Sequence, residues 1–224
     1  MDDERLFDDY DAFAEAYVEA TRDNLYNARY ERPALRALAG SVDGLDVLDA
    51  GCAGGEQSLW LHEQGARVVA LDANAKMVEI ARKRLPVEVE VRLADLQETL
   101  PLSKESVDLV FSSLTMHYVR EWEPMLREFR RVTRPGGALA FSTHHPCMGL
   151  HEDDQLGVDY FSTGLIVDHW NGFGPEPVRV RYWRRPLQSI VSSLVETGWR
   201  IEKLVEPRLA DAIDPWFLLI RATR

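Results

Sequence analysis

Short apolar segments alternate with helical patterns between residues 45 and 142. Each segment is too short for a buried helix and is rich in aliphatic residues, which is typical of a buried strand. Parallel neighbours must be joined by long crossovers, so this alternation predicts an α/β fold with a parallel sheet and helices on both faces. The expected strands are 45–49, 67–72, 87–92, 107–112 and 138–142, and the expected helices are 56–64, 74–84 and 124–133.

The first forty residues predict an N-terminal helical cap (1–40). Apolar side chains recur there at the spacing of one helix face. These side chains are Tyr10, Phe13, Ala14, Tyr17 and Val18. Pro33 suits the first turn of a second helix, and Gly40 suits its end.

The last third predicts an insertion followed by a closing hairpin. Residues 144–185 are rich in glycine, proline, histidine and aromatic residues and show no strand–helix period. We interpret them as a lid over a substrate, inserted after the fifth strand of a single domain (1–224). The remaining expected elements are lid strands 159–166 and 178–183, a helix 186–197, and strands 200–206 and 216–222.

The chain carries an excess of acidic residues, with a formal net charge of −11 at pH 7. An acidic surface repels phosphate backbones, which disfavours nucleic acid as a partner. Arg179, Arg181, Arg184 and Arg185 lie close together, but the alternation of Arg179 and Arg181 predicts the solvated face of a strand. No apolar run reaches the ~20 residues that cross a bilayer, and the N-terminus is acidic rather than signal-like. We therefore expect a cytoplasmic monomer or homodimer with no membrane partner.

Cysteine usage favours neither a disulfide framework nor a zinc finger, because Cys52 and Cys147 form no CxxC motif. His144, His145, Cys147 and His151 lie near one another in sequence. No second ligand cluster accompanies them, and we expect no metal.

A glycine-rich turn joins the first expected strand to the first helix, in the sequence Val47-Leu48-Asp49-Ala50-Gly51-Cys52-Ala53-Gly54-Gly55. Bare backbone lets a ligand approach closely, and the start of the helix offers unpaired N–H groups. Asp49 suits a ligand with positive charge, such as one that carries an amine and a sulfonium. The same carboxylate would repel a pyrophosphate.

Further landmarks follow at the ends of later strands. Asp72 ends the second strand, where a carboxylate can accept both hydroxyls of a ribose. Asp95 follows the third strand and can accept from the exocyclic amine of adenine, with Leu96 and Met77 as apolar walls. Residues 112–113 close the fourth strand. Because open α/β sheets bind ligands at the carboxyl ends of their strands, these landmarks predict one nucleoside site.

Together these motifs resemble those of the class I S-adenosylmethionine (SAM)-dependent methyltransferases, in the branch that includes ubiquinone-biosynthesis-type and other small-molecule enzymes. The resemblance covers about residues 8–145. It rests on VLDAGCAGG (47–55), VVALDAN (68–74), LADLQETLP (93–101), VDLVFSSLTMHYV (107–119) and LREFRRVTRPGGALAFST (126–143). It implies a Rossmann-like, mostly parallel seven-stranded sheet with an antiparallel last strand, SAM as the cofactor, and methyl transfer to a small-molecule acceptor.

The resemblance also implies roles for matching residues. The turn that begins at Gly51 would hold the methionine part of SAM, and helices at the N-terminus would close over that part. The expected cofactor-binding residues are Asp49, Gly51, Cys52, Ala53, Asp72, Ala73, Met77, Asp95, Leu96, Ser112, Ser113, Tyr17 and Tyr30. One departure stands out. The family pattern acidic-x-Gly-x-Gly-x-Gly has Ala53 at its central glycine, and alanine tolerates positive φ less well than glycine.

Catalysis by such a protein depends mainly on positioning, because methyl transfer from a sulfonium is an in-line displacement. A general base is needed only where the acceptor must lose a proton. His117, after the fourth strand, and His144 or His145, after the fifth, are the candidates. The structural alternatives are packing or helix capping for His117 and a turn for His145.

The expected lid is dense in aromatic residues, which are Tyr160, Phe161, Trp170, Phe173, Tyr182 and Trp183. They fit an apolar or aromatic acceptor, and they fit an ordinary lid core equally well. Asp168, His169 and Trp170 are expected to line the acceptor pocket.

Three other interpretations are left open by the sequence. A nicotinamide-dependent oxidoreductase would share the turn and Asp72, but it would not need Asp49 or Asp95. A nucleic-acid amino-methyltransferase would usually carry an Asn/Asp-Pro-Pro-aromatic motif where this chain has Ser112-Ser113-Leu114-Thr115. A non-catalytic SAM-binding regulatory protein would look the same at the cofactor site.

Overall fold

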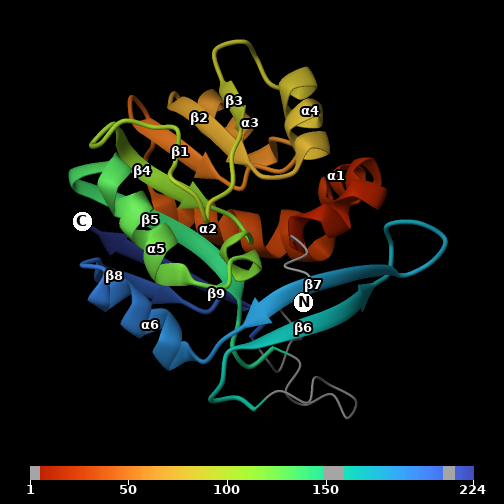
Figure 1. Cartoon of the computed structure of the whole chain (residues 1–224). Helices are drawn as coiled ribbons and strands as arrows, with labels where there is room; N and C mark the ends of the chain where they lie inside the picture. The colour runs from red at the N-terminus through yellow and green to blue at the C-terminus, as the bar shows by residue number, and fades with distance from the viewer. Residues whose placement is uncertain (1–5, 149–158, 209–214) are drawn as a thin grey trace.

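A seven-stranded sheet runs through the centre of the computed structural model, which describes residues 6–148, 159–208 and 215–224 (Figure 1). Its strands are β1 (Asp46–Ala50), β2 (Arg67–Asp72), β3 (Glu90–Leu93), β4 (Val107–Ser112), β5 (Thr133–His144), β8 (Arg200–Val205) and β9 (Phe217–Thr223). They lie in the order β3-β2-β1-β4-β5-β9-β8. Strands β1 to β5 are parallel to their neighbours, and β9 runs antiparallel between β5 and β8. The predicted Rossmann-like sheet with an antiparallel last strand is confirmed.

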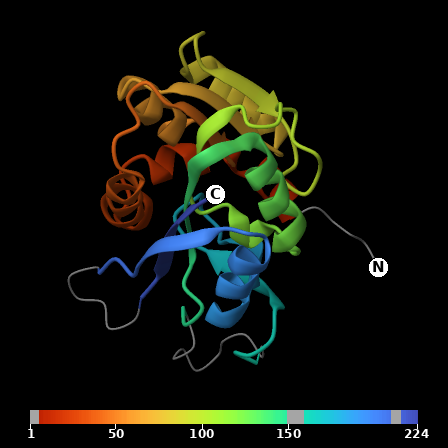
Figure 2. The same cartoon turned by 90° about the vertical axis from the view of Figure 1, so that its left-hand side faces the viewer.

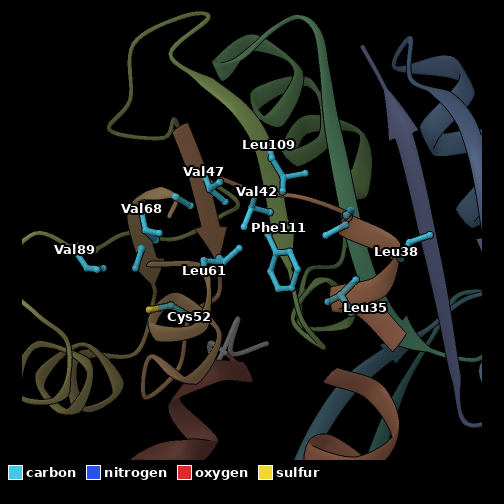
Figure 3. Packing of buried hydrophobic residues seen from close by; sticks show 14 of the residues in the cluster. Leu35, Leu38, Val42, Val47, Cys52, Leu61, Val68, Val89, Leu109 and Phe111 are labelled. Atoms are coloured by element: carbon cyan, nitrogen blue, oxygen red, sulfur yellow. The ribbon is translucent and has the colours of Figure 1, made fainter. Parts of the chain in front are cut away.

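Helices cover both faces of the sheet. They are α2 (Arg32–Ala39), α3 (Glu56–Glu63) and α4 (Ala75–Arg84) on one face, and α5 (Trp122–Val132) and α6 (Leu187–Glu196) on the other. Leu35, Leu61 and Val68 belong to the core of the first face (Figure 3). Phe129 and Leu194 belong to the core of the second face, and both are fully buried. None of the helices in the described residues is long and apolar enough to cross a membrane.

The third strand begins later than predicted, at Glu90 rather than residue 87. The Val89 N–H donates to the Pro86 carbonyl at 3.0 Å, so the chain turns where the alternating pattern suggested a strand. The alternation of valine and glutamate therefore predicted the element but not its start.

The N-terminal cap is helical but is not a single α-helix. It consists of a 3₁₀ helix (Leu6–Ala12), α1 (Ala14–Thr21), a π-helix (Leu25–Glu31) and α2. The expected continuous face breaks at Phe13, whose φ of −138° is not helical. Tyr10, Phe13 and Ala14 pack against Met77 of α4 and Val180 of the insertion, so tertiary packing outweighs the helical spacing there.

The insertion after β5 forms a separate two-stranded antiparallel sheet, β6 (Gly164–Trp170) and β7 (Val178–Arg184) (Figure 1). In the 90° view, α6 lies in front of this hairpin (Figure 2). The first strand starts at Gly164 rather than residue 159. Asp159 begins a turn instead, in which its carbonyl accepts from the Ser162 N–H at 3.1 Å.

The arginines of β7 correct one prediction. Arg179 is exposed, but Arg181 is 6% exposed and forms two hydrogen bonds with Asp9, at 2.8 and 2.7 Å. Arg184 and Arg185 are also buried. The predicted solvated face is therefore wrong for Arg181, because the N-terminal segment covers that side of β7.

The chain order reverses between β1 and β4, which are neighbours in the sheet although β2 and β3 lie between them in sequence. Helical crossovers leave on opposite sides at such a point, and a crevice opens at the carboxyl ends of the strands. The glycine-rich turn follows β1 and opens into this crevice.

Candidate active site

A narrow cleft of about 100 Å³ lies at the carboxyl ends of β1, β2 and β4. Most of the expected cofactor-binding residues line it. These are Tyr17, Gly51, Ala53, Asp72, Ala73, Met77, Asp95, Leu96 and Ser113. The structure thus brings together the landmarks at the ends of four different strands, β1 to β4.

The turn after β1 is held in shape by Asp72. The two carboxylate oxygens of Asp72 accept from the N–H groups of Ala53 and Asn74, each at 2.8 Å. Ala53 has φ 46°, in the left-handed region that glycine adopts most easily. This conformation is the steric reason for the glycine that the family pattern has at this position. A Cβ on Gly51 would collide with the Thr115 side chain, and this close approach requires a glycine. Asn74 also caps α4, because its side chain accepts from the Met77 N–H at 3.0 Å.

Asp49 is buried at the end of β1, and only 1% of it is exposed. One carboxylate oxygen accepts from the Ser58 hydroxyl at 2.5 Å, and the other has no hydrogen-bond partner among the described residues. Burial raises the pKa of Asp49 to about 7, with the nearby Asp72 and Glu31 carboxylates adding to the effect. A cationic group on a ligand would supply the missing partner.

A smaller cavity of about 40 Å³ adjoins the cleft and is lined by both a guanidinium and Asp49. Arg32, at the start of α2, lines it together with Asp49 and Cys52. The Arg32 guanidinium donates to the Thr21 carbonyl at 2.8 Å and is 9% exposed. Opposite charges at this spot suit the two charged ends of an amino acid. Sequence reasoning missed Arg32, since nothing in its local pattern marks it.

At the other end of the cleft, Leu96 and Met77 are buried and form apolar walls. Asp95 stands beside them, and its carboxylate accepts from the Gln97 N–H at 2.9 Å. A flat base with a hydrogen-bonding edge fits between such groups.

Four expected residues stand apart from the cleft, and one of them, Asp49, lines the smaller cavity described above. The Ser112 hydroxyl is fully buried and donates to the Ala50 carbonyl at 2.8 Å. The Tyr30 hydroxyl donates to the Pro207 carbonyl at 2.6 Å, and its ring packs on Phe217. Neither residue is on the walls of the cavities that the described residues form, while Cys52 lines only the smaller one.

Glu31 is a second residue that sequence reasoning missed. It is fully buried, and its carboxylate accepts from the hydroxyls of Ser113 at 3.0 Å and Ser142 at 2.5 Å. The Ser142 hydroxyl oxygen in turn accepts from the Leu114 N–H at 2.9 Å. This network fixes Leu114, which has φ 46°.

A third cavity, of about 680 Å³, lies between the N-terminal helices and the β6–β7 hairpin. Tyr17 and Leu114 line this cavity, the narrow cleft and the smaller cavity. Asp168, His169 and Trp170 line it from the hairpin, where the sequence predicts an acceptor pocket.

His117 and His144 also line this third cavity. His117 is 2% exposed, and its two ring nitrogens and Nδ1 of His144 have no hydrogen-bond partner among the described residues. Burial lowers the pKa of His144 to about 3 and the pKa of His117 well below its usual value. Both imidazoles are therefore neutral near pH 7.

His145 occupies a different place. Its Nε2 lies 2.8 Å from Oε1 of Glu206, and its Nδ1 accepts from the Cys147 N–H at 3.1 Å. It is held in a turn and is not on the walls of the cavities described above. His151 lies outside the described residues. No group of three His, Cys, Asp or Glu side chains in the described part of the chain could hold a metal ion.

A sheet of this order, with a glycine turn and carboxylates at successive strand ends, is typical of a nucleoside-binding protein. Residues 48–141 match a family model described as a methyltransferase domain. The chain belongs to the class I SAM-dependent methyltransferases, and SAM is its cofactor. This membership excludes the nicotinamide-dependent oxidoreductase interpretation and makes the protein an enzyme.

Individual relatives extend the match over most of the chain. The chain is 35% identical to malonyl-[acyl-carrier protein] O-methyltransferase of Salmonella typhimurium, over 92% of this chain and 89% of that protein. The corresponding protein of Yersinia pestis is 44% identical, but over only 45% of this chain and 37% of its own length. A SAM-dependent methyltransferase structure from Mesorhizobium loti matches with a TM-score of 0.69 and 30% identity, over 87% of this chain and 97% of that one.

Proposed function

We propose that this methyltransferase transfers the methyl group of SAM to a small molecule bound in the 680 Å³ cavity. The observation that carries the proposal is the shared wall: Tyr17 and Leu114 border both the cofactor cleft and this cavity. Ligand sites usually measure about 300–1,000 Å³, so the cavity is large enough for a small acceptor.

The cofactor contacts follow from the positions of the lining groups. Asp72 is proposed to accept from the ribose hydroxyls, and Asp95 with Leu96 to hold the adenine. Asp49 and Arg32 are proposed to bind the ammonium and carboxylate groups of the methionine part. The backbone of the turn after β1 lies between these sites and suits the close approach of the ligand.

With SAM bound, the acceptor's lone pair forms a bond to the methyl carbon while the C–S bond breaks and its electron pair stays on sulfur. The protein's own contribution is to orient the acceptor and to exclude water. His117 is positioned to accept a proton at one of its unpartnered ring nitrogens. A methylated hydroxyl is a much stronger acid than an imidazolium, so even a weakly basic imidazole can take this proton.

The cleft must widen for the cofactor to enter, because about 100 Å³ is smaller than a typical ligand site. The Tyr10 hydroxyl contacts the Tyr118 hydroxyl across the cleft, and the N-terminal segment is also tied to β7 through Asp9 and Arg181. Movement of this segment is the simplest way to open the site.

Calorimetry with two ligands tests the cofactor contacts. Arg32→Gln should weaken binding of S-adenosylhomocysteine (SAH) by roughly tenfold, the effect of about one lost charged hydrogen bond. It should leave binding of 5′-methylthioadenosine unchanged, because that nucleoside lacks the amino-acid carboxylate. Arg29→Gln, in an exposed ion pair with Asp23, is the matched control.

Isotope-labelled SAM tests the acceptor class. The protein is incubated with labelled SAM and a small-molecule extract, and labelled products are identified by mass spectrometry. Label in low-molecular-weight products would support the proposal. Label confined to protein or nucleic acid would contradict it, as would an Arg32→Gln variant that binds SAH normally.

A further inference from the structure

The wall of the 680 Å³ cavity carries no lysine or arginine among the described residues. Its ionisable side chains besides tyrosines are Asp168, His117, His144 and His169, and both His117 and His144 are neutral. Lysine and arginine are also absent from the sequences of 149–158 and 209–214. These two segments lie outside the described residues and adjoin the lining regions in sequence. Apart from histidines and tyrosines, Asp168 is therefore the one ionisable side chain on the described wall.

Two buried guanidinium groups lie outside the wall of the cavity, although Nη1 of Arg185 has no hydrogen-bond partner among the described residues. Arg185 is near enough to affect His117, but it donates to the Val119 and Arg120 carbonyls, at 2.8 and 3.0 Å. Its guanidinium also lies over the Trp122 ring, 4.4 Å from the centroid. Arg32 lines the smaller cavity at the proposed methionine end. A carboxylate in the large cavity would therefore meet no lysine or arginine on the described wall, and removing it from water without a cationic partner is unfavourable.

The same wall is well suited to a flat apolar body. Trp170 and Phe173 of the insertion lie with ring centroids 6.1 Å apart, and Phe173 stacks on Tyr17 at 5.6 Å. Tyr118 and Phe217 add further aromatic surface. Aromatic rings in such an arrangement favour an aromatic ligand through apolar and ring–ring contacts.

The histidine pair supplies the hydrogen-bonding end of the site. A neutral imidazole has one donor and one acceptor nitrogen, and both nitrogens of His117 lack a partner in the described structure. Buried polar groups are nearly always satisfied in functional states, so a bound ligand is the natural partner. An O–H or N–H group on the acceptor would satisfy one nitrogen and place the nucleophile beside Leu114, at the junction with the cofactor cleft.

We propose that the acceptor is an uncharged molecule with a flat apolar body and an O–H or N–H group that binds the His117–His144 pair. The proposal rests on the function proposed above and narrows its substrate. It sets this chain apart from relatives whose names specify a malonyl group, which carries a free carboxylate. In the transfer, the acceptor atom bonds to the methyl carbon, the C–S electron pair goes to sulfur, and the O–H or N–H proton passes through His117 to water.

Two probes of the same shape and different charge test this proposal. Binding of 2-naphthol and 2-naphthoate to the full chain saturated with SAH is measured by calorimetry. We expect 2-naphthol to bind at least roughly tenfold more tightly than 2-naphthoate. Equal affinity, tighter binding of 2-naphthoate, or no binding of either probe to SAH-loaded protein would each overturn the proposal.

A new cation provides the converse test. Leu25 lines the cavity and is 47% exposed, so the fold should tolerate Leu25→Arg. This variant should reduce the preference for 2-naphthol by roughly tenfold, whereas the neutral control Leu25→Gln should not. An unchanged preference in Leu25→Arg, with SAH affinity intact, would show that wall charge does not select the ligand.

The malonyl alternative is tested with labelled SAM and the N-acetylcysteamine thioester of malonate. Formation of the labelled methyl ester would overturn this proposal while supporting methyl transfer to a small molecule. Failure to bind SAH would instead count against the proposed cofactor contacts, so the two failures can be distinguished.

Discussion

His117 and His144 stack face to face, with ring centroids 3.9 Å apart and ring planes inclined by 12°. His117 belongs to a short 3₁₀ helix after β4 (Met116–Tyr118), and His144 ends β5. The two strands are parallel neighbours, so their carboxyl ends deliver both imidazoles to the same cavity. Tyr182 of the insertion packs edge-on against both rings and holds the pair in place.

His117→Leu should slow turnover by roughly 100-fold if His117 accepts the acceptor's proton, the lower range for general base catalysis. SAM affinity should not change, because His117 is absent from the wall of the cofactor cleft. Steady-state kinetics and calorimetry check the two expectations. The control is His62→Leu on α3, and a normal kcat in His117→Leu would rule out the proton-transfer role.

Asp49→Asn should change how stability depends on pH. An aspartate has a pKa near 3.9 when unfolded, and burial raises the pKa of Asp49 to about 7 in the fold. Between these values the folded chain holds a proton that the unfolded chain has lost, so the free energy of unfolding falls as pH rises from about 4 to 7. The variant lacks this loss and should be more stable than the wild type at about pH 8, by about 2 kcal/mol.

Urea unfolding at about pH 4 and about pH 8 measures this difference, which should vanish at the lower pH. Glu79→Gln, on the exposed side of α4, is the control. Asp49→Asn should also weaken SAM binding, since it removes the negative charge proposed to pair with the ammonium group. The assignment would be contradicted if the free energy of unfolding depended on pH in the same way in the wild type and in Asp49→Asn.

Ala53→Gly should stabilise the fold by roughly 0.5–1 kcal/mol. The left-handed conformation at φ 46° costs an alanine about 1–2 kcal/mol of conformational energy. Glycine avoids this cost, but part of the gain is offset because its unfolded chain has more conformational entropy. Chemical denaturation measures the change. Ala81→Gly, at a buried helical site in α4, should have the opposite sign. Equal destabilisation by both variants would mean that no strain is stored at residue 53.

Asp72→Ala should weaken SAM binding by about 1–3 kcal/mol, the range for hydrogen bonds to a charged group. It should also lower stability, because the N–H groups of Ala53 and Asn74 lose their acceptor. Asp72→Asn keeps one acceptor oxygen and should keep more of the stability than of the affinity. Calorimetry and thermal unfolding separate the two effects, and unchanged affinity in Asp72→Ala would refute the ribose role.

Local pattern was enough to predict the order of the βα units, the glycine turn at Gly51 and the cap at Asn74. It also placed Asp49, Asp72 and Asp95 at one edge of the sheet, because the carboxyl ends of parallel strands share an edge. These features depend on periodicity and turn chemistry within a few residues, which a sequence shows directly.

Tertiary structure alone decided which distant groups meet. Arg32 lines the same cavity as Asp49, Arg181 pairs with Asp9 instead of solvent, and Tyr30 turns away from the cleft to Pro207. The stacking of His117 on His144 likewise depends on the register of two strands and the hairpin packed over them. Such contacts follow from how elements far apart in the chain pack in space, and side-chain direction at a strand end is not encoded in local spacing.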